Sequence, residues 1–530
     1  MKRLSILFLF ALSLYSCTTS EKKIPVIAER DTTITKEISY SELFLDSVSI
    51  AQFNQPADAP DSLHGQIQNF YNLRNYQFAW FFPDGAGEFV NTFLSLQNDY
   101  IHYSGDSTLY NPVLTARIDS LHGLKVIDPK DPIIIETELS LTQQFFRYAN
   151  KAYSGNQKIN ARELNWFIPR KKIDTRAFLD SLLKNKGENL ATYEPVNRQY
   201  RLLREKVLKF HQIHNTLDTN SITFTKKLKK GDSAESIKLV KRKLFQLGDL
   251  QVNDSTSHYD STLSAAVINF QNRMGLTADG TIGPNFIKEL NVPISERIKQ
   301  ILINMERIRW MPATPSTDYI LVNIPEFQMH VYEQGELAFN INVVVGSEAH
   351  NTVIFSGSLN QIVFSPYWNI PPGILKNEIL PGIRRNPNYL ARHNMERYSG
   401  GIRQKPGKSN SLGLVKFLFP NSYNIYFHDT PSKGLFGSTN RAFSHGCIRL
   451  KEPVKLAEFL LRKDSTWTSE KIKKAMSSGK EKYVRLKGKN EIPVFIGYFT
   501  AWVDRNGQLQ FRKDVYGHDR KMADHLFAVN

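Results

Sequence analysis

The spacing of the hydrophobic residues changes at Pro312, and this change divides the chain into two kinds of structure. Before Pro312, apolar residues recur every three or four positions, as they do on one face of a helix. After it, they alternate with other residues, which is typical of strands and hairpins. The alternating positions are Ile320, Val322 and Ile324, then, after the turn Gln334-Gly335, Leu337, Phe339, Ile341, Val343 and Val345. A β-rich domain is therefore expected from about Asp318.

The length of 530 residues suffices for about three domains, and 41% hydrophobic content is typical of folded globular domains. Residues 40–220 are predicted to form a mainly helical scaffold domain. Apolar residues recur there at helical spacing: Leu63, Ile67, Phe70 and Tyr71, then Tyr200, Leu203, Val207 and Phe210. The aromatic run 74–81 is interpreted as core rather than as a sugar-stacking surface. The region shows no catalytic constellation.

Residues 228–292 form a second predicted helical unit, followed by a connecting helix over 294–311. Two amphipathic patterns lie in this unit, one with Ile237, Val240, Leu244 and Leu247, the other with Leu263, Ala266, Val267 and Phe270. Asp279-Gly280 is a turn signal, since glycine adopts positive φ without strain.

The first residues of the chain predict export and a lipid anchor. Met1-Lys2-Arg3 is basic, and Leu4–Leu14 is apolar but too short to span a bilayer comfortably. Leu14-Tyr15-Ser16-Cys17 resembles a bacterial lipobox. Residues 1–17 are thus expected to be a lipoprotein signal peptide with lipidation at Cys17, residues 18–39 a polar tether, and the protein periplasmic and membrane-anchored. The alternative is an ordinary signal peptide with a coincidental cysteine.

The net charge of +17 is compatible with acidic partners such as anionic lipid, nucleic acid or carboxylates. Its lysines are spread along the chain, however, and no compact platform combines basic and aromatic residues. The charge is therefore interpreted mainly as solvated surface, and nucleic acid is not an expected partner.

Cys447 is one of two cysteines in the chain, and the other, Cys17, is assigned to the signal peptide. The mature chain then has no second thiol with which Cys447 can pair. A free thiol is a liability in an oxidising compartment, so its presence indicates a chemical role. The cysteine follows a glycine in the run Ser444-His445-Gly446-Cys447-Ile448-Arg449, and His428 precedes the run. A thiol, an imidazole base and backbone amides near a glycine are the parts of nucleophilic acyl transfer.

This spacing, together with the upstream residues 413–417 and 441–443, resembles the L,D-transpeptidase (YkuD-type) family in its large periplasmic branch. The resemblance implies an α+β multidomain protein. Its parts would be the helical scaffold, a three-helix peptidoglycan-binding module at 228–292, and a β-rich catalytic domain at 318–462. A capping insertion is expected at about 374–411 and a structural C-terminal extension at 463–530. Whether the module binds glycan or only packs is left open.

The resemblance also implies roles for the site residues. Cys447 is the nucleophile and His428 the base, oriented by the carbonyl of Asp429. The amides of Gly446 and Cys447 form the oxyanion hole. Supporting and substrate-binding roles, each with a structural alternative, fall to further residues: Ser444 and His445 in the loop, Arg449 for a stem-peptide carboxylate, and Trp368 and Asn369 in the donor groove. Arg449 departs from the asparagine of many small family members, which bears on substrate choice.

The implied reaction cross-links the third residues of two peptidoglycan stem peptides without a cofactor or metal. Cys447 would form a thioester with a tetrapeptide donor and release D-Ala, and a diaminopimelate amine would accept the acyl group. L,D-carboxypeptidase activity or D-amino-acid exchange at the same thiol is the first alternative. Others are a non-catalytic peptidoglycan-binding lipoprotein, a zinc hydrolase using His428, His445 and Cys447, and a papain-like peptidase, whose cysteine would precede its histidine.

Overall fold

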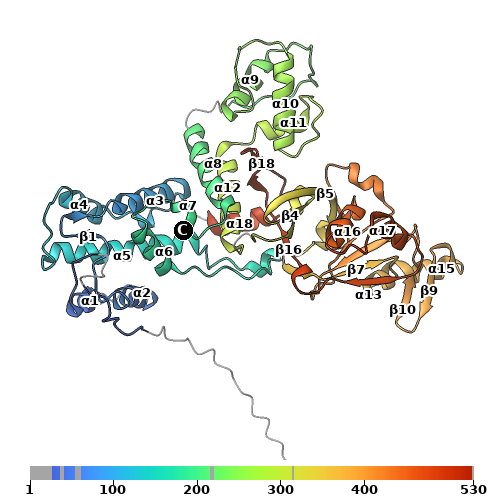
Figure 1. Ribbon diagram of the computed structural model, residues 1–530. Helices are drawn as coiled ribbons and strands as arrows, with labels where there is room; N and C mark the ends of the chain where they lie inside the picture. Colours follow the sequence, from blue (N-terminus) through green and yellow to red (C-terminus); the bar gives the residue numbers. More distant parts are fainter. Residues whose placement is uncertain (1–26, 36–40, 54–60, 215–219, 313–314, 528–530) are drawn as a thin grey trace, which may run out of the picture. The chain divides into compact units, whose positions relative to one another are not determined.

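The computed structural model describes residues 27–35, 41–53, 61–214, 220–312 and 315–527 (Figure 1). Cys17 and the predicted signal peptide lie outside these residues. Within them, no helix has the length and apolar character needed to span a bilayer. The described residues divide into two compact units, one comprising those up to residue 94 with 111–147 and 175–190, and the other comprising the rest.

The first unit is helical and is built around an aromatic core. Its segments come from α1 (Ser47–Phe53), α2 (Asp61–Asn72), α3 (Phe89–Ser104), α4 (Pro112–Leu121), α5 (Pro132–Tyr153) and α6 (Thr175–Lys184), with a short hairpin of β1 (Phe81–Phe82) and β2 (Gly85–Ala86). Trp80 is fully buried, with its ring centroid 5.5 Å from that of Phe93. The aromatic run is thus core, as predicted. Buried Glu138 accepts hydrogen bonds from the Trp80 amide (2.9 Å) and the Tyr71 hydroxyl (2.8 Å).

The small predicted module lies in the second unit, among helices that follow residue 190 (Figure 1). The elements are α7 (Leu190–Tyr193, at the boundary), α8 (Arg198–His214), α9 (Ser236–Leu247), α10 (Ser261–Arg273), α11 (Pro284–Leu290) and α12 (Ile294–Trp310). The apolar positions of α9 and α10 that sequence spacing selected are largely buried. Gly280 has a φ of +67°, which agrees with the predicted turn. The side chain of Asp260 caps α10 by accepting from the amide of Leu263 (2.7 Å).

Arg273, at the end of α10, fixes the module to the strand β18 (Leu509–Phe511). Its guanidinium forms a buried ion pair with Asp249 (Nε to Oδ1, 2.7 Å) and donates from Nη1 to the carbonyl of Leu509 (3.0 Å). Arg512 donates in return to the carbonyl of Arg273 (3.0 Å). Gly275 lies against the side chain of Arg512. It has no room for a side chain of its own, because an added Cβ would lie 2.5 Å from the Cδ of Arg512. The module therefore packs closely on the β-rich part.

Replacing Arg273 with methionine is expected to destabilise the module by about 3–5 kcal/mol, because it leaves the Asp249 carboxylate buried and unpaired. Native-state hydrogen exchange of the α10 amides measures this effect locally. The matched control is Lys299→Met, which breaks the half-exposed pair with Glu296 (2.8 Å) and should change stability by less than about 1 kcal/mol. Equal protection of α10 in both variants would contradict the expectation.

The largest sheet forms the β-rich part. Its order is β15-β7-β11-β12-β14-β5-β4-β3-β16-β6, with β13 beside β5. The bounds are β3 (Tyr319–Asn323), β4 (Gln328–Glu333), β5 (Glu336–Gly346), β6 (Ser356–Leu359), β7 (Gln361–Phe364), β11 (Val415–Leu418), β12 (Phe427–His428), β13 (Ala442–Ser444), β14 (Ile448–Leu450), β15 (Lys482–Arg485) and β16 (Ile492–Gly497). The predicted turn between β4 and β5 has positive φ at both Gln334 (50°) and Gly335 (82°), as a two-residue hairpin requires.

Residues 463–530 contribute strands to this sheet and are not an appendage to it. β16 pairs in parallel with β3, and β15 pairs with β7. The segment also holds α17 (Ser469–Met476), the hairpin of β17 (Ala501–Val503) with β18, whose turn contains Gly507, and a final helix α18 (His518–Leu526), which the sequence did not predict. Between β14 and α17 lies α16 (Pro453–Leu461).

The segment predicted to be a capping insertion, about 374–411, belongs to a small subdomain, called the capping subdomain below. A three-stranded sheet of β8 (Trp368–Asn369), β9 (Met395–Tyr398) and β10 (Gly401–Gln404) accompanies α13 (Pro372–Ile374), a π-helical turn (Leu375–Ile379), α14 (Leu380–Arg385) and α15 (Tyr389–Arg392). It has a core of its own, formed by Ile370, Ile379, Met395 and Ile402. The α+β multidomain architecture predicted from the sequence is therefore confirmed.

Candidate active site

Two short parallel strands bring the predicted catalytic residues into one neighbourhood. Phe427 of β12 pairs with Ile448 of β14, and His428 pairs with Arg449. The amide of Ile448 donates to the carbonyl of Tyr426 (3.2 Å). Cys447, directly before β14, is thus placed beside the strand that ends in His428, although the sequence between them passes through another 3-10 helix and strand.

His428 is buried, and its ring has a fixed orientation. Its Nδ1 lies 2.5 Å from the carbonyl oxygen of Asp429, so Nδ1 carries the proton and Nε2 is the basic nitrogen of the neutral ring. Burial, and then the positive charge of Arg449, lower the pKa of His428 to about 4. The imidazole is therefore neutral at pH 7 and able to accept a proton.

Cys447 is a free, half-buried thiol. Its Sγ donates to the carbonyl of Asn424 (3.5 Å), a residue in the left-handed region with a φ of 56°. Burial raises the pKa of the thiol, although a hydrogen bond with Tyr426 and the charge of Arg449 act in the opposite direction. Protonated thiol and neutral imidazole are thus the resting forms at neutral pH, in contrast to a preformed thiolate–imidazolium pair.

Tyr426 is a site residue that the sequence reasoning missed. Burial and the neighbouring Cys447 raise its pKa, so the hydroxyl stays protonated as a donor. Tyr426 directly precedes β12, and its ring centroid lies 5.8 Å from that of His428. An aromatic residue two positions before the predicted base was therefore a signal available in the sequence.

The loop before Cys447 is held by Ser444. The Ser444 hydroxyl accepts from the Gly446 amide (3.2 Å) and donates to the Cys447 carbonyl (2.6 Å). Gly446 has a φ of +108°, a conformation that favours glycine. Of the two amides predicted to form the oxyanion hole, that of Gly446 is thus engaged within the loop, whereas the Cys447 amide has no acceptor among the described residues.

The remaining predicted residues surround this loop. The Nε2 of His445, which is half-exposed, lies 3.5 Å from an oxygen of Glu378 in the capping subdomain, and its ring centroid lies 4.7 Å from that of His350. The Asp429 carboxylate accepts from the Leu414 amide (2.9 Å) and from Lys433 (2.6 Å).

Among the described residues, Arg449 has no carboxylate partner, and its buried Nε lacks a hydrogen-bond partner. The internal salt bridge that was the structural alternative for this residue is thus not seen in the described part of the chain. Trp368 packs against the small core of the capping subdomain, which agrees with the packing alternative. Asn369 is exposed and pairs with Arg403 of β10.

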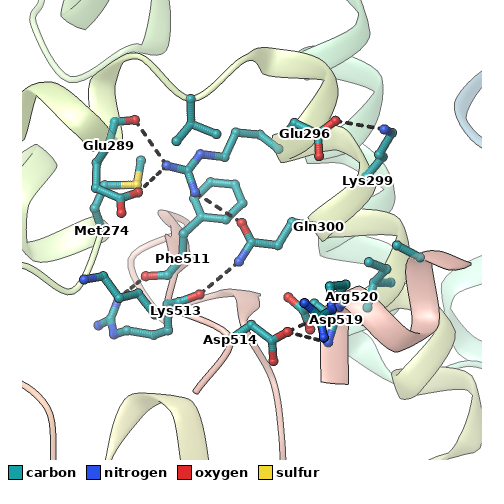
Figure 2. Close-up of a pocket in the computed structure, with 15 residues that line it drawn as sticks. Met274, Glu289, Glu296, Lys299, Gln300, Phe511, Lys513, Asp514, Asp519 and Arg520 are labelled. Atoms are coloured by element: carbon teal, nitrogen blue, oxygen red, sulfur yellow. Dashed lines mark hydrogen bonds and ion pairs between the residues drawn. The ribbon is translucent and has the colours of Figure 1, made fainter. Parts of the chain in front are cut away.

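A cavity of about 410 Å³ lies elsewhere, between the helical module, α12, β18 and α18 (Figure 2). Neither Cys447 nor His428 lines it. Some of its charged groups are bonded to other residues of the lining. Arg297 binds Glu289 (2.6 Å), and Asp514 accepts from the amide of Asp519 (2.9 Å) at the start of α18. The cavity is interpreted as a seam between packed elements and not as the site of chemistry.

No group of three or more His, Cys, Asp and Glu side chains in the described ranges is arranged to hold a metal ion. His428, His445 and Cys447 therefore do not form the ligand set that the zinc alternative needs.

Comparisons with known families match three parts of the chain. Residues 317–513 match the L,D-transpeptidase catalytic domain, residues 65–207 a scaffold domain, and residues 233–290 a putative peptidoglycan binding domain. The resemblance found in the sequence is thus confirmed: parts of the chain match an L,D-transpeptidase catalytic domain of the YkuD type, a scaffold domain and a putative peptidoglycan binding domain.

A curated relative from Haemophilus influenzae, described as a putative L,D-transpeptidase, is 32% identical over 263 residues. The match covers 45% of this chain and 51% of the relative, so the chain spans about half the length of the relative that it matches.

Solved structures of L,D-transpeptidases from Xylanimonas cellulosilytica and Stackebrandtia nassauensis are each 14% identical to the chain, with TM-scores of 0.17 and 0.21. They cover 52% and 46% of this chain, and 99% and 91% of their own.

Proposed function

We propose that the protein is an L,D-transpeptidase that cross-links the third residues of peptidoglycan stem peptides through a thioester on Cys447. The observation that carries this proposal is the parallel pairing of β12 with β14, which sets a neutral imidazole of fixed tautomer in the strand next to a free thiol. The family match of residues 317–513 supports the reaction class.

In the proposed first step, the thiol turns from Asn424 and gives its proton to Nε2 of His428 as Sγ attacks the carbonyl carbon of the third stem residue. The amide of Cys447 donates to the resulting oxyanion, and the Tyr426 hydroxyl is near enough to the thiol to assist. The intermediate collapses, the C–N bond to D-Ala breaks, and the proton on His428 passes to the leaving amine. A thioester remains on Sγ.

In the second step, the side-chain amine of another stem attacks the thioester carbonyl. His428 takes the amine proton and returns it to the departing thiolate, which restores the resting enzyme. Arg449, which has no carboxylate partner among the described residues, is available for a carboxylate of the stem. The half-exposed Glu378 and His445 lie where the capping subdomain meets the nucleophile loop.

The test is product identity with purified disaccharide-tetrapeptide as both donor and acceptor. We expect mass spectrometry to detect a dimer lighter than two substrates by one D-Ala, formed by the wild-type protein and absent with Cys447→Ala. A tripeptide without dimer would reassign the protein as an L,D-carboxypeptidase with the same nucleophile. Absence of any covalent adduct or product, on intact sacculi as well, would contradict the proposal and favour a binding-only role.

A further inference from the structure

Thr352 lies just after the short 3-10 helix Glu348–His350 and is fully buried beneath the nucleophile loop. Its hydroxyl accepts a hydrogen bond from the amide of Gly346, the last residue of β5 (2.9 Å). The same hydroxyl donates to the carbonyl oxygen of Gly446 (2.8 Å). Because the oxygen accepts from an amide on one side, its own proton is directed to the Gly446 carbonyl on the other.

This contact fixes the direction of the neighbouring amide. The carbonyl of Gly446 and the N–H of Cys447 belong to one planar trans peptide, in which the two bonds point in opposite directions. A carbonyl held on Thr352 therefore aims the Cys447 amide away from Thr352. Since Ser444 occupies the amide of Gly446, this Cys447 amide is the backbone donor that the loop leaves for an oxyanion.

Tyr516, close to the end of the described chain, holds Thr352 in place. Its hydroxyl donates to the carbonyl of Gly346 (2.7 Å) and accepts from the amide of Thr352 (3.3 Å). The backbone amide of Tyr516 donates to the hydroxyl of Tyr498 (2.9 Å), which in turn donates to Asp514 (2.6 Å). A chain of hydrogen bonds therefore runs from the C-terminal segment to the peptide group that precedes the nucleophile.

We propose that Thr352 is a positioning residue that orients the oxyanion-binding amide of Cys447, and that Tyr516 holds Thr352 in the required place. The inference rests on the proposed acyl-transfer function and adds two residues that lie outside the Ser-His-Gly-Cys signature. Neither residue contacts the reacting atoms. Both act on the rate through the direction of one peptide group.

The decisive experiment compares Thr352→Val, which keeps the shape and removes the hydroxyl, with the matched control Thr352→Ser, which keeps the hydroxyl. With disaccharide-tetrapeptide as substrate, we expect the valine variant to lower the acylation rate constant about 10- to 100-fold, with KM within about 2-fold of wild type, because a misdirected donor loses part of its value in the transition state. The serine variant should stay within about 3-fold of wild type.

Alkylation of Cys447 by iodoacetamide is the second readout. This displacement at carbon develops no oxyanion, so the Thr352→Val variant should alkylate at the wild-type rate while its acylation is impaired. A merely structural role would slow both reactions together. Tyr516→Phe should also slow acylation without slowing alkylation, with a smaller effect. This variant replaces Thr352→Val in the test if the valine variant does not fold.

Three results bear on the inference in different ways. Wild-type acylation in Thr352→Val, or parallel loss of acylation and alkylation in both Thr352→Val and Tyr516→Phe, would overturn it. Selective loss of acylation with rescue by serine supports it. If the wild-type protein itself forms no thioester, the proposed function fails, and this outcome is recognised before any variant is compared.

Discussion

Substituting Cys447 with serine is expected to reduce thioester-dependent transfer by about 10⁴-fold or more, although the variant keeps a hydroxyl nucleophile in the same place. The reason lies in the base. Burial and Arg449 lower the pKa of His428 to about 4, which makes it a weaker base than an ordinary histidine. Such a base can assist a thiol, which is acidic and strongly nucleophilic, but gives little activation to a serine hydroxyl.

Single-turnover incubation with disaccharide-tetrapeptide, followed by intact-mass measurement of the protein, checks this expectation. The wild-type protein should gain the mass of the acyl donor minus D-Ala, and Cys447→Ser should gain none on the same time scale. The thermal unfolding transition of the variant serves as the folding control. An acylated serine variant formed within tenfold of the wild-type rate would show that the histidine is a stronger base than the buried site implies.

Replacing His428 with alanine is expected to lower acyl transfer by about 10²- to 10⁴-fold, the usual contribution of a positioned general base. The pH dependence gives a sharper criterion. The neutral ring is the active form and its pKa is about 4, so transfer should persist at pH 5 and fall only as the pH drops through about 4. An ordinary histidine, with a pKa of 6.5, would already be largely inactive at pH 5.

Iodoacetamide again separates two explanations. Because burial raises the pKa of the Cys447 thiol above its ordinary value, alkylation of the wild-type protein should still be increasing at a pH where alkylation of a free cysteine has levelled off. The His428→Ala variant should follow nearly the same curve, since a neutral imidazole does not stabilise a thiolate. An alkylation rate at pH 7 that falls by more than tenfold on removal of His428 would indicate a thiolate–imidazolium pair and would refute the neutral resting state.

The periodicity and turn signals predicted much of the fold because they report local preferences. Alternation in residues 337–345 predicted strand β5, and Gln334-Gly335 predicted its hairpin, since both features depend on neighbouring residues alone. The place of β16 was not predictable in the same way. Each residue of β16 pairs with a residue of β3 that lies 174 positions earlier in the sequence. The local pattern of neither strand indicates this pairing. Residues 463–530 were consequently interpreted as an extension.

The candidate site shows the same division. The motif predicted roles for Cys447 and His428, and in the structure Cys447 directly precedes the strand that pairs in parallel with the strand of His428. It did not supply Thr352 or Tyr516, because a buried threonine or tyrosine has no distinctive spacing and its importance depends on which carbonyl it meets after folding. The motif also did not predict that the Gly446 amide donates to Ser444. A sequence shows which donors are present but not which of them already have acceptors.

The position of β16 within the sheet affects when, during synthesis, the surroundings of Cys447 can form. Strand β16 and Tyr516 both lie in the last forty residues or so, yet one completes the sheet beside β3 and the other supports the loop that carries the thiol. A polypeptide growing from its N-terminus thus produces Cys447 long before it can assemble the surroundings of that residue. Fragments that end before β16 would carry the motif around Cys447 without these contacts, so we expect their thiol to show none of the proposed acyl transfer.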